Sequence, residues 1–154
     1  MPIIQSDIDV HGEEFATNRE AMLKAVASFR EIEQNCLNKA AEAKAKFEKR
    51  GQLLPRERLN LLLDPGAPFL ELSSLAGYKL HDDKDGTQAG GGIISGIGYI
   101  AGVRCLVTAS NSAIKGGTIS PTGLKKTLRL QQIAFENKLP VVALTESGGA
   151  NLNY

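Results

Sequence analysis

Two consecutive glycines near the end of the sequence are the residues best suited to chemistry. They are Gly148 and Gly149, which follow the apolar run VVALT through Glu146 and Ser147. Two glycines after a buried strand can expose two backbone N–H groups, with no side chain to block a substrate carbonyl. Such a pair suits an oxyanion hole, in which each donor contributes about 10²–10³ in rate. A tight turn that needs positive φ explains the same glycines equally well on local grounds.

Ser147 raises the alternative of a nucleophilic serine, which needs a base to take its proton. The two histidines, His11 and His81, lie far away in the sequence. Thr145 and Glu146 precede the serine, so the G-x-S-x-G elbow is absent as well. We therefore favour backbone donors over a serine nucleophile.

The segment 86–135 combines ten glycines with five basic residues and contains no acid. Glycines let backbone N–H groups approach a ligand closely, and neighbouring cations favour phosphate. One interpretation is a site for a phosphate-bearing small molecule; the other, which composition alone favours, is a solvated helix face with flexible turns. The basic residues are Arg104, Lys115, Lys125, Lys126 and Arg129.

Other cofactor sites find little support. Gly96-Ile97-Gly98 followed by Gly102 has the wrong spacing for a dinucleotide fingerprint, and no Walker-type string is present. The two cysteines, Cys36 and Cys105, are far apart and lack metal-ligand spacing, so we expect no bound metal and a reducing, cytoplasmic location.

The composition is that of one ordinary globular domain. The chain has 154 residues, 42% of them hydrophobic and 23% charged, with a net charge of +1. These values exclude a disordered or membrane-spanning chain, and the balanced charge gives no reason to expect nucleic acid or a membrane as a partner. The first twenty residues resemble neither a secretory signal nor a transit peptide.

The second part of the chain alternates strands and helices. The runs 93–100 and 103–110 predict two strands joined by a hairpin turn at Ala101-Gly102. A helix over 124–138 and a buried strand over 141–145 follow, with Pro140 between them, and this order predicts a mixed α/β (α+β) layer fold. We expect 68–80 to be extended and 81–92 to be a polar loop. The expected apolar helix face comprises Leu124, Leu128, Ile133, Ala134 and Phe135.

The first part, residues 1–51, predicts a helical arm. Apolar residues recur at helical spacing from Phe15, which favours one helix over about 14–50, with Thr17 and Glu20 as a possible capping box. Gly51 should end it. Such a helix would be roughly 55 Å long. It is too long to pack on its own core, so we expect it to lie across a partner subunit or another domain.

Three stretches, 50–80, 90–118 and 136–152, resemble the carboxyltransferase (β) subunit of biotin-dependent acyl-CoA carboxylases. The strings AIKGGT and SGGANLNY resemble the 3-methylcrotonyl-CoA and geranyl-CoA branch of that family more than the propionyl-CoA branch, and LAGYKLHDD favours geranyl-CoA. The resemblance implies a crotonase-like fold, a spiral of β-β-α units, here incomplete and preceded by the long helix. Residues 52–154 would be the first part of the acyl-CoA carboxyltransferase N-terminal domain, so the resemblance implies a truncated subunit.

The resemblance also implies a mechanism. Carboxybiotin, carried on a partner α subunit, releases CO₂, and the biotin ureido anion left behind takes the γ proton of the enoyl-CoA. The resulting dienolate carries its charge on the thioester oxygen. Gly148 and Gly149 would bind that oxygen through their N–H groups, without a metal. Lys115, Gly116, Gly117 and Ala150 would line the CoA or acyl pocket. The active site would form between β subunits of a homo-oligomer.

Two other functions stay open. The chain could be a non-catalytic fragment that acts only in assembly, with its long helix docked on a partner. A crotonase-type hydratase or isomerase would also use paired backbone donors, but it needs a carboxylate base, for which Glu146 is the nearby candidate.

Overall fold

A two-residue turn joins the two longest strands of the molecule. In the computed structural model, which describes residues 6–80 and 83–150, β2 spans Ile93–Ile100 and β3 spans Val103–Ser110. Ala101 and Gly102 have φ values of 50° and 77°, as a hairpin turn of this length requires. Both of their N–H groups donate to the carboxylate of Asp64 at 2.7 Å. The predicted hairpin is confirmed.

The hairpin forms the centre of a four-stranded sheet in the order β1-β2-β3-β4. The short strand β1, Leu70–Glu71, is antiparallel to β2, and β4, Val141–Leu144, is parallel to β3. The helix α4, Pro121–Glu136, makes the crossover between β3 and β4. Thus β2, β3 and α4 form one β-β-α unit, and the mixed α/β prediction is confirmed. The predicted extension over 68–80 is wrong beyond β1, because turns begin at Ser73, whose φ is 53°.

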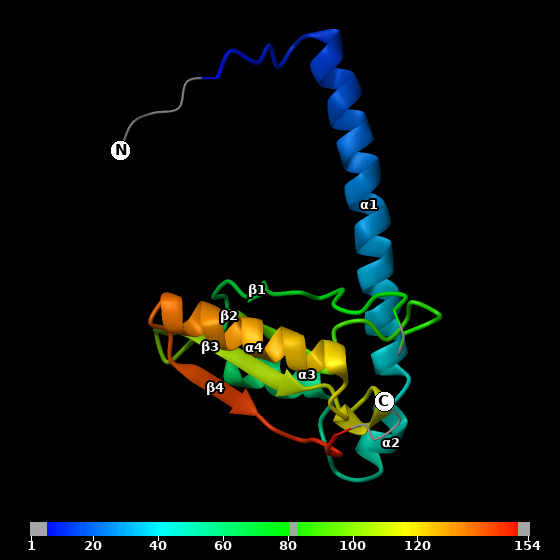
Figure 1. The fold of residues 1–154 in the computed structure, drawn as a ribbon, viewed down its shortest axis with the longest axis vertical. Helices are drawn as coiled ribbons and strands as arrows, with labels where there is room; N and C mark the ends of the chain where they lie inside the picture. Colours follow the sequence, from blue (N-terminus) through cyan, green and yellow to red (C-terminus); the bar gives the residue numbers. More distant parts are fainter. Residues whose placement is uncertain (1–5, 81–82, 151–154) are drawn as a thin grey trace.

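One helix covers each face of the sheet (Figure 1). On one face α3, Pro55–Leu62, places Leu59 against a buried cluster of strand residues, Ile94, Cys105, Val107 and Ala109. On the other face α4 places Leu130 and Ala134 against Leu106. Alternate residues of β3 therefore serve opposite layers, as the two-residue repeat of a strand requires.

The buried face of α4 differs from the predicted one. Leu124, Leu128 and Phe135 are 53%, 56% and 86% exposed, whereas Gly123 and Lys126 are buried with Leu130 and Ala134. The reason is the close approach of the glycine-rich loop, since a Cβ atom on Gly123 would lie 2.3 Å from the carbonyl oxygen of Gly91. Of the predicted apolar face, Ala134 alone is fully buried among the described residues.

The arm consists of two helices rather than one. The helix α1 spans Glu13–Ala41 and α2 spans Lys44–Glu48, so the prediction of one helix over 14–50 is wrong at residues 42–43. The predicted capping box is not formed, because Thr17 lies inside the helix and its hydroxyl donates to the carbonyl of Glu13 at 3.0 Å. Most of α1 projects away from the sheet, while α2 lies beside it (Figure 1). Gly51, with φ of 66°, follows α2 as expected.

Within the described ranges, no helix combines the length and the apolar character needed to cross a membrane.

Candidate functional site

Two segments that carry predicted site residues lie side by side. The short helix η1, Lys115–Gly117, contacts the segment that follows β4. The Gly148 N–H donates to the Gly116 carbonyl at 3.1 Å, and the Ile119 N–H donates to the Gly149 carbonyl at 2.9 Å. A parallel β-bridge also pairs Ile119 with Ala150. The structure therefore brings the predicted residues 115–117 and 148–150 together, although about thirty positions separate them in the sequence.

Glycine at position 117 allows this close approach. Its φ is 68°, and a Cβ atom there would lie 2.6 Å from the carbonyl oxygen of Glu146. Lys115 and Gly116 also have positive φ, at 48° and 65°, so the chain turns in the left-handed region through all three residues. A side chain at Gly117 would push the two segments apart.

Both predicted oxyanion donors have acceptors within the chain. The Gly148 N–H bonds to Gly116, and the Gly149 N–H donates to the hydroxyl oxygen of Ser147 at 3.1 Å. A thioester oxygen would have to replace these acceptors. The exchange is energetically feasible, because a bond to a charged group contributes about 1.5–3 kcal/mol against about 0.5–1.5 kcal/mol for a neutral pair. The oxyanion role of the two glycines stays a prediction.

Gly149 is the more accessible of the two. It is exposed, its φ is 92°, and an added Cβ atom would meet nothing within 4 Å. A Cβ atom on Gly148 would instead lie 3.2 Å from the Gly116 carbonyl oxygen. There is therefore more open space beside Gly149 than beside Gly148, although both residues are exposed.

A hollow of about 430 Å³ opens beside these glycines. We call it the glycine hollow; residues of the ranges 43–50, 112–116 and 146–148 line it. It contains Lys115, Gly116 and Gly148 from the predicted site, and it adds Lys46 and Arg50 from the arm. No sequence signal pointed to these two cations, because they belong to the predicted helical arm, about 65 residues before η1.

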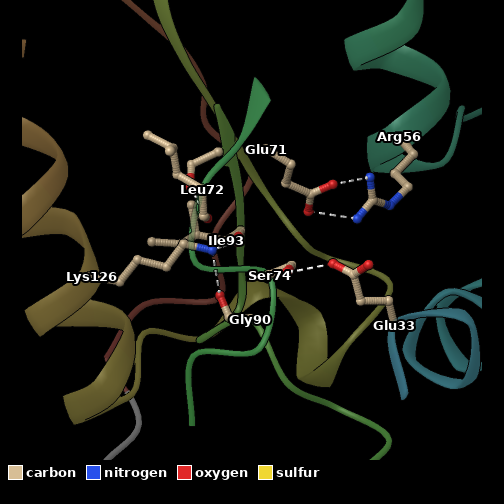
Figure 2. Close-up of polar contacts among 9 residues, drawn as sticks. Glu33, Arg56, Glu71, Leu72, Ser74, Gly90, Ile93 and Lys126 are labelled. Carbon is tan, nitrogen blue, oxygen red and sulfur yellow. Dashed lines mark hydrogen bonds and ion pairs between the residues drawn. The ribbon is translucent and has the colours of Figure 1, made fainter. Parts of the chain in front are cut away.

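The other predicted cations do not gather here. Lys126 is 5% exposed, and its Nζ donates to the carbonyl oxygens of Gly90 and Ile93 at 3.1 and 2.7 Å (Figure 2). Burial lowers the pKa of Lys126 to about 8. Lys126 fits neither the phosphate site nor the favoured solvated helix face, because its ammonium group is buried and binds the glycine-rich loop inside the fold. Arg104, Lys125 and Arg129 are exposed and do not line the glycine hollow.

Neither Ser147 nor Glu146 has the partners of a catalytic side chain. The Ser147 hydroxyl donates to the carbonyl of Gly117 at 3.0 Å. The Glu146 carboxylate accepts from Arg58 of α3 at 2.9 Å. His11 is exposed on the arm, and His81 lies outside the described residues. This geometry argues against a serine nucleophile and against Glu146 as the base of a hydratase or isomerase.

Polar contacts away from the glycine hollow hold α1 against the loop that follows β1, and α3 against β1 itself. The Ser74 hydroxyl donates to Glu33 of α1 at 2.6 Å, and Arg56 binds Glu71 through two bonds of 2.9 and 2.8 Å (Figure 2). Burial raises the pKa of the nearby Cys36 thiol.

Across residues 6–80 and 83–150, no three His, Cys, Asp or Glu side chains gather in a way that could hold a metal ion.

Comparison with known proteins adds a family to this geometry. A family profile described as the carboxyl transferase domain matches residues 46–153. The β subunit of geranyl-CoA carboxylase from P. aeruginosa superposes with a TM-score of 0.89 at 83% identity, over 99% of this chain and 28% of that one. The probable mitochondrial methylcrotonoyl-CoA carboxylase β chain of Drosophila melanogaster is 42% identical over 97% of this chain and 26% of its own length.

A propionyl-CoA carboxylase β chain from Cereibacter sphaeroides is more distant, at 32% identity over 88% of this chain and 24% of its own length. The chain thus spans about a quarter of the length of the curated relatives it matches.

Proposed function

The chain belongs to the carboxyl transferase domain family, and from this premise we propose that it holds the acyl-CoA thioester in a biotin-dependent acyl-CoA carboxylase β subunit. The neighbours have the crotonase-like fold implied by the sequence resemblance, and the β-β-α unit of this chain belongs to it. The observation that carries the proposal is the glycine hollow, where residues 115–116 and Gly148 line one space. The activity belongs to the complete subunit, of which this chain would supply one wall of the site.

Backbone donors would stabilise the reacting thioester. Loss of a γ proton from an α,β-unsaturated acyl-CoA spreads negative charge onto the thioester oxygen. The N–H of Gly149, followed by that of Gly148, would exchange its present acceptor for this oxygen. Fixed dipoles of this kind act where charge develops, so no acidic side chain is needed. The enolate carbon then forms the new bond to CO₂.

Biotin enters this proposal only as the carrier that supplies the carboxyl group. The described residues do not form a cradle for its ring. Among the described residues, three buried side-chain oxygen atoms lack a hydrogen-bond partner, and they lie at two separate places. Thr87 Oγ1 and Asn111 Oδ1 are beside α1, and Ser112 Oγ is in the wall of the glycine hollow. We therefore assign no step to these residues and place biotin on a partner subunit.

A branched enoyl-CoA is the substrate class that we propose, with geranyl-CoA ahead of 3-methylcrotonyl-CoA. Support comes from the 83% identity to the geranyl-CoA carboxylase subunit, against 42% for the methylcrotonoyl-CoA and 32% for the propionyl-CoA relative. Steady-state rates of the assembled enzyme with the three thioesters test this order. A preference for propionyl-CoA would refute it.

The donor role is tested by a pair of variants in the full-length subunit. Gly149→Pro removes the N–H and also forces φ from 92° to about −65°, whereas Gly149→Ala keeps the N–H and adds the strain of a side chain at positive φ. We expect carboxylation by the proline variant to fall about 10²–10³-fold below that of the alanine variant. Equal rates for the two variants would show that the Gly149 N–H does not bind the oxyanion.

A second candidate function is assembly alone, and α1 favours it. No residue of Glu13–Ala41 is buried in the described structure, and Met22, Leu23 and Phe29 are 65%, 50% and 46% exposed. An assembly fragment would bind a partner through this helix without turnover. The partner that we propose is another β subunit, so that the helix takes part in a homo-oligomer. Size-exclusion chromatography of the chain, followed by an assay of the eluted complex, separates the two functions.

We also keep a cytoplasmic location as a proposal. Cys36 and Cys105 are both free, which fits a reducing compartment. Fractionation of cells with an antibody against the chain tests it.

A further inference from the structure

More basic than acidic side chains line the glycine hollow. Three cations line it: Lys46 and Arg50 of the arm and Lys115 of η1. One carboxylate, Glu146, also lines it, but this group is ion-paired with Arg58 at 2.9 Å. The pair cancels its own charge, so the hollow has an excess of positive charge. A polar neutral ligand would gain little from such a wall, whereas an anion with more than one charge would be attracted.

The two arm cations have no carboxylate to neutralise them. Among the ion pairs of the described residues, none involves Lys46 or Arg50. Their neighbour Lys44 differs, since it lies 3.9 Å from both Glu48 and Glu57. Lys46 and Arg50 are thus available to bind a ligand.

The backbone holds these cations in place. Lys46 lies in α2, and Arg50 lies in the turn that follows the helix, just before Gly51. Phe47, which lies between them, is 5% exposed and fixes α2 to the body of the domain. The Arg50 N–H donates to the Phe47 carbonyl at 2.9 Å, and the Gln52 N–H donates to the same oxygen at 3.0 Å. Less side-chain and backbone freedom is lost on binding when the segment that carries the cations is already packed.

We propose that Lys46 and Arg50 bind phosphate groups of the CoA moiety, while the thioester end reaches Gly148, which lines the same hollow, and the adjoining Gly149. This inference rests on the proposed function, because it takes CoA as the carrier of the acyl group. Arginine can bind a phosphate through two parallel hydrogen bonds, and lysine acts as a point charge. The arm therefore contributes directly to the substrate site, through its second helix and the turn that follows it.

The phosphates lie far from the reacting bonds and do not change charge during the reaction. Contacts with them stabilise the bound substrate and the transition state equally, so they lower KM and leave kcat unchanged. Pantetheine thioesters carry the same reactive end without the nucleotide phosphates. The two substrates together separate phosphate binding from every effect on chemistry or folding.

The experiment measures kcat and KM of the full-length subunit, assembled with its biotin-carrying partner, for an acyl-CoA and for the corresponding acyl-pantetheine. The variants are Lys46→Gln and Arg50→Gln, with Lys44→Gln as the control on the same helix. For acyl-CoA we expect about a five- to twentyfold rise in KM for each hollow variant, at unchanged kcat. For acyl-pantetheine, and for the control with either substrate, we expect less than about a twofold change.

Unchanged KM values for acyl-CoA, or equal losses with both substrates, would overturn the inference while the proposed function stands. If the unmodified enzyme carboxylates neither substrate, the proposed function fails. Titration calorimetry with CoA and with pantetheine then decides the inference separately. A CoA affinity that is the same in all variants would overturn it, and a loss confined to CoA in Lys46→Gln and Arg50→Gln would support it.

Discussion

The two helices of the arm differ in what they give to the molecule. The 29-residue α1 buries none of its residues, whereas the five-residue α2 buries Phe47 and places Lys46 in the wall of the glycine hollow. Periodic apolar residues produced a clear prediction for α1 and hid the break at 42–43. Helical periodicity therefore indicates a helix, but it does not indicate whether the helix has a packing partner in the same chain.

Packing explains the difference. Helices in proteins owe most of their stability to an apolar face buried on a neighbour. The last turns of α1 find such a neighbour through Glu33 and Cys36, whereas Met22 and Phe29 find none within the described structure. The short α2 would not persist alone, but Phe47 and the turn at Gly51 keep it beside the sheet.

The largest predicted change in stability comes from the buried ring of Phe47 in α2. Phe47→Ala removes a buried ring and should lower the free energy of unfolding by about 3–5 kcal/mol. Phe29→Ala removes a ring that is 46% exposed on α1 and should change it by less than about 1 kcal/mol. Urea unfolding followed by circular dichroism measures both. Similar losses in the two variants would mean that α1 packs as tightly as α2.

The next prediction concerns Lys126, the buried cation of α4. Burial lowers the pKa of Lys126 from 10.5 to about 8, with Glu71 opposing and Arg56 adding to the shift. The folded chain therefore releases this proton first, and stability should rise as the pH passes from 8 towards 10.5. The gain should reach up to about 3 kcal/mol, at 1.36 kcal/mol for each pKa unit.

Lys126→Met is the matched control for that pH dependence. Burial raises the pKa of the Cys36 thiol, so this group makes the fold less stable at high pH. The contribution is the same in the chain and in the variant, and it cancels when their free energies of unfolding are subtracted. Chemical unfolding at several pH values between 7 and 10 provides the measurement. A difference that does not change with pH would show that Lys126 has an ordinary pKa.

The third prediction concerns Gly117, where η1 meets the segment that follows β4. Gly117→Ala places a Cβ atom 2.6 Å from the Glu146 carbonyl oxygen, at a φ of 68°, and should cost about 2 kcal/mol or more. Gly116→Ala has a similar φ of 65° but meets nothing within 4 Å, so strain alone should cost about 1 kcal/mol. Thermal melts of the two variants provide the comparison. Equal melting temperatures would contradict the close approach described for η1.

The smallest effect comes from shortening the arm. Deletion of residues 1–28 removes most of α1 and retains Glu33 and Cys36, so the free energy of unfolding should change by less than about 1 kcal/mol. Urea unfolding of the shortened chain measures it. A loss of several kcal/mol would show that the free part of α1 contributes to the stability of the isolated chain, against the comparison made above.

Much of the architecture could be read from local signals. Ala101-Gly102 predicted the hairpin, Pro140 separated α4 from β4, and Gly51 ended the arm. The ordered strings around KGG and SGGA also identified the family before any coordinates, because their order and spacing together are specific. The possible capping box at Thr17 is not formed, because the helix begins at Glu13, one turn before that residue.

By itself the sequence determined the order of the elements, the hairpin, the family and the glycine pair. These properties depend on neighbours within a few residues, where backbone sterics and side-chain periodicity act. Contacts between distant segments decide that Lys126 lies inside, that the Gly148 N–H already has an acceptor, and that Lys46 and Arg50 line the same hollow. Burial, hydrogen-bond partners and shared cavities depend on segments 30 to 100 residues apart, and the packing of the whole chain places those segments together.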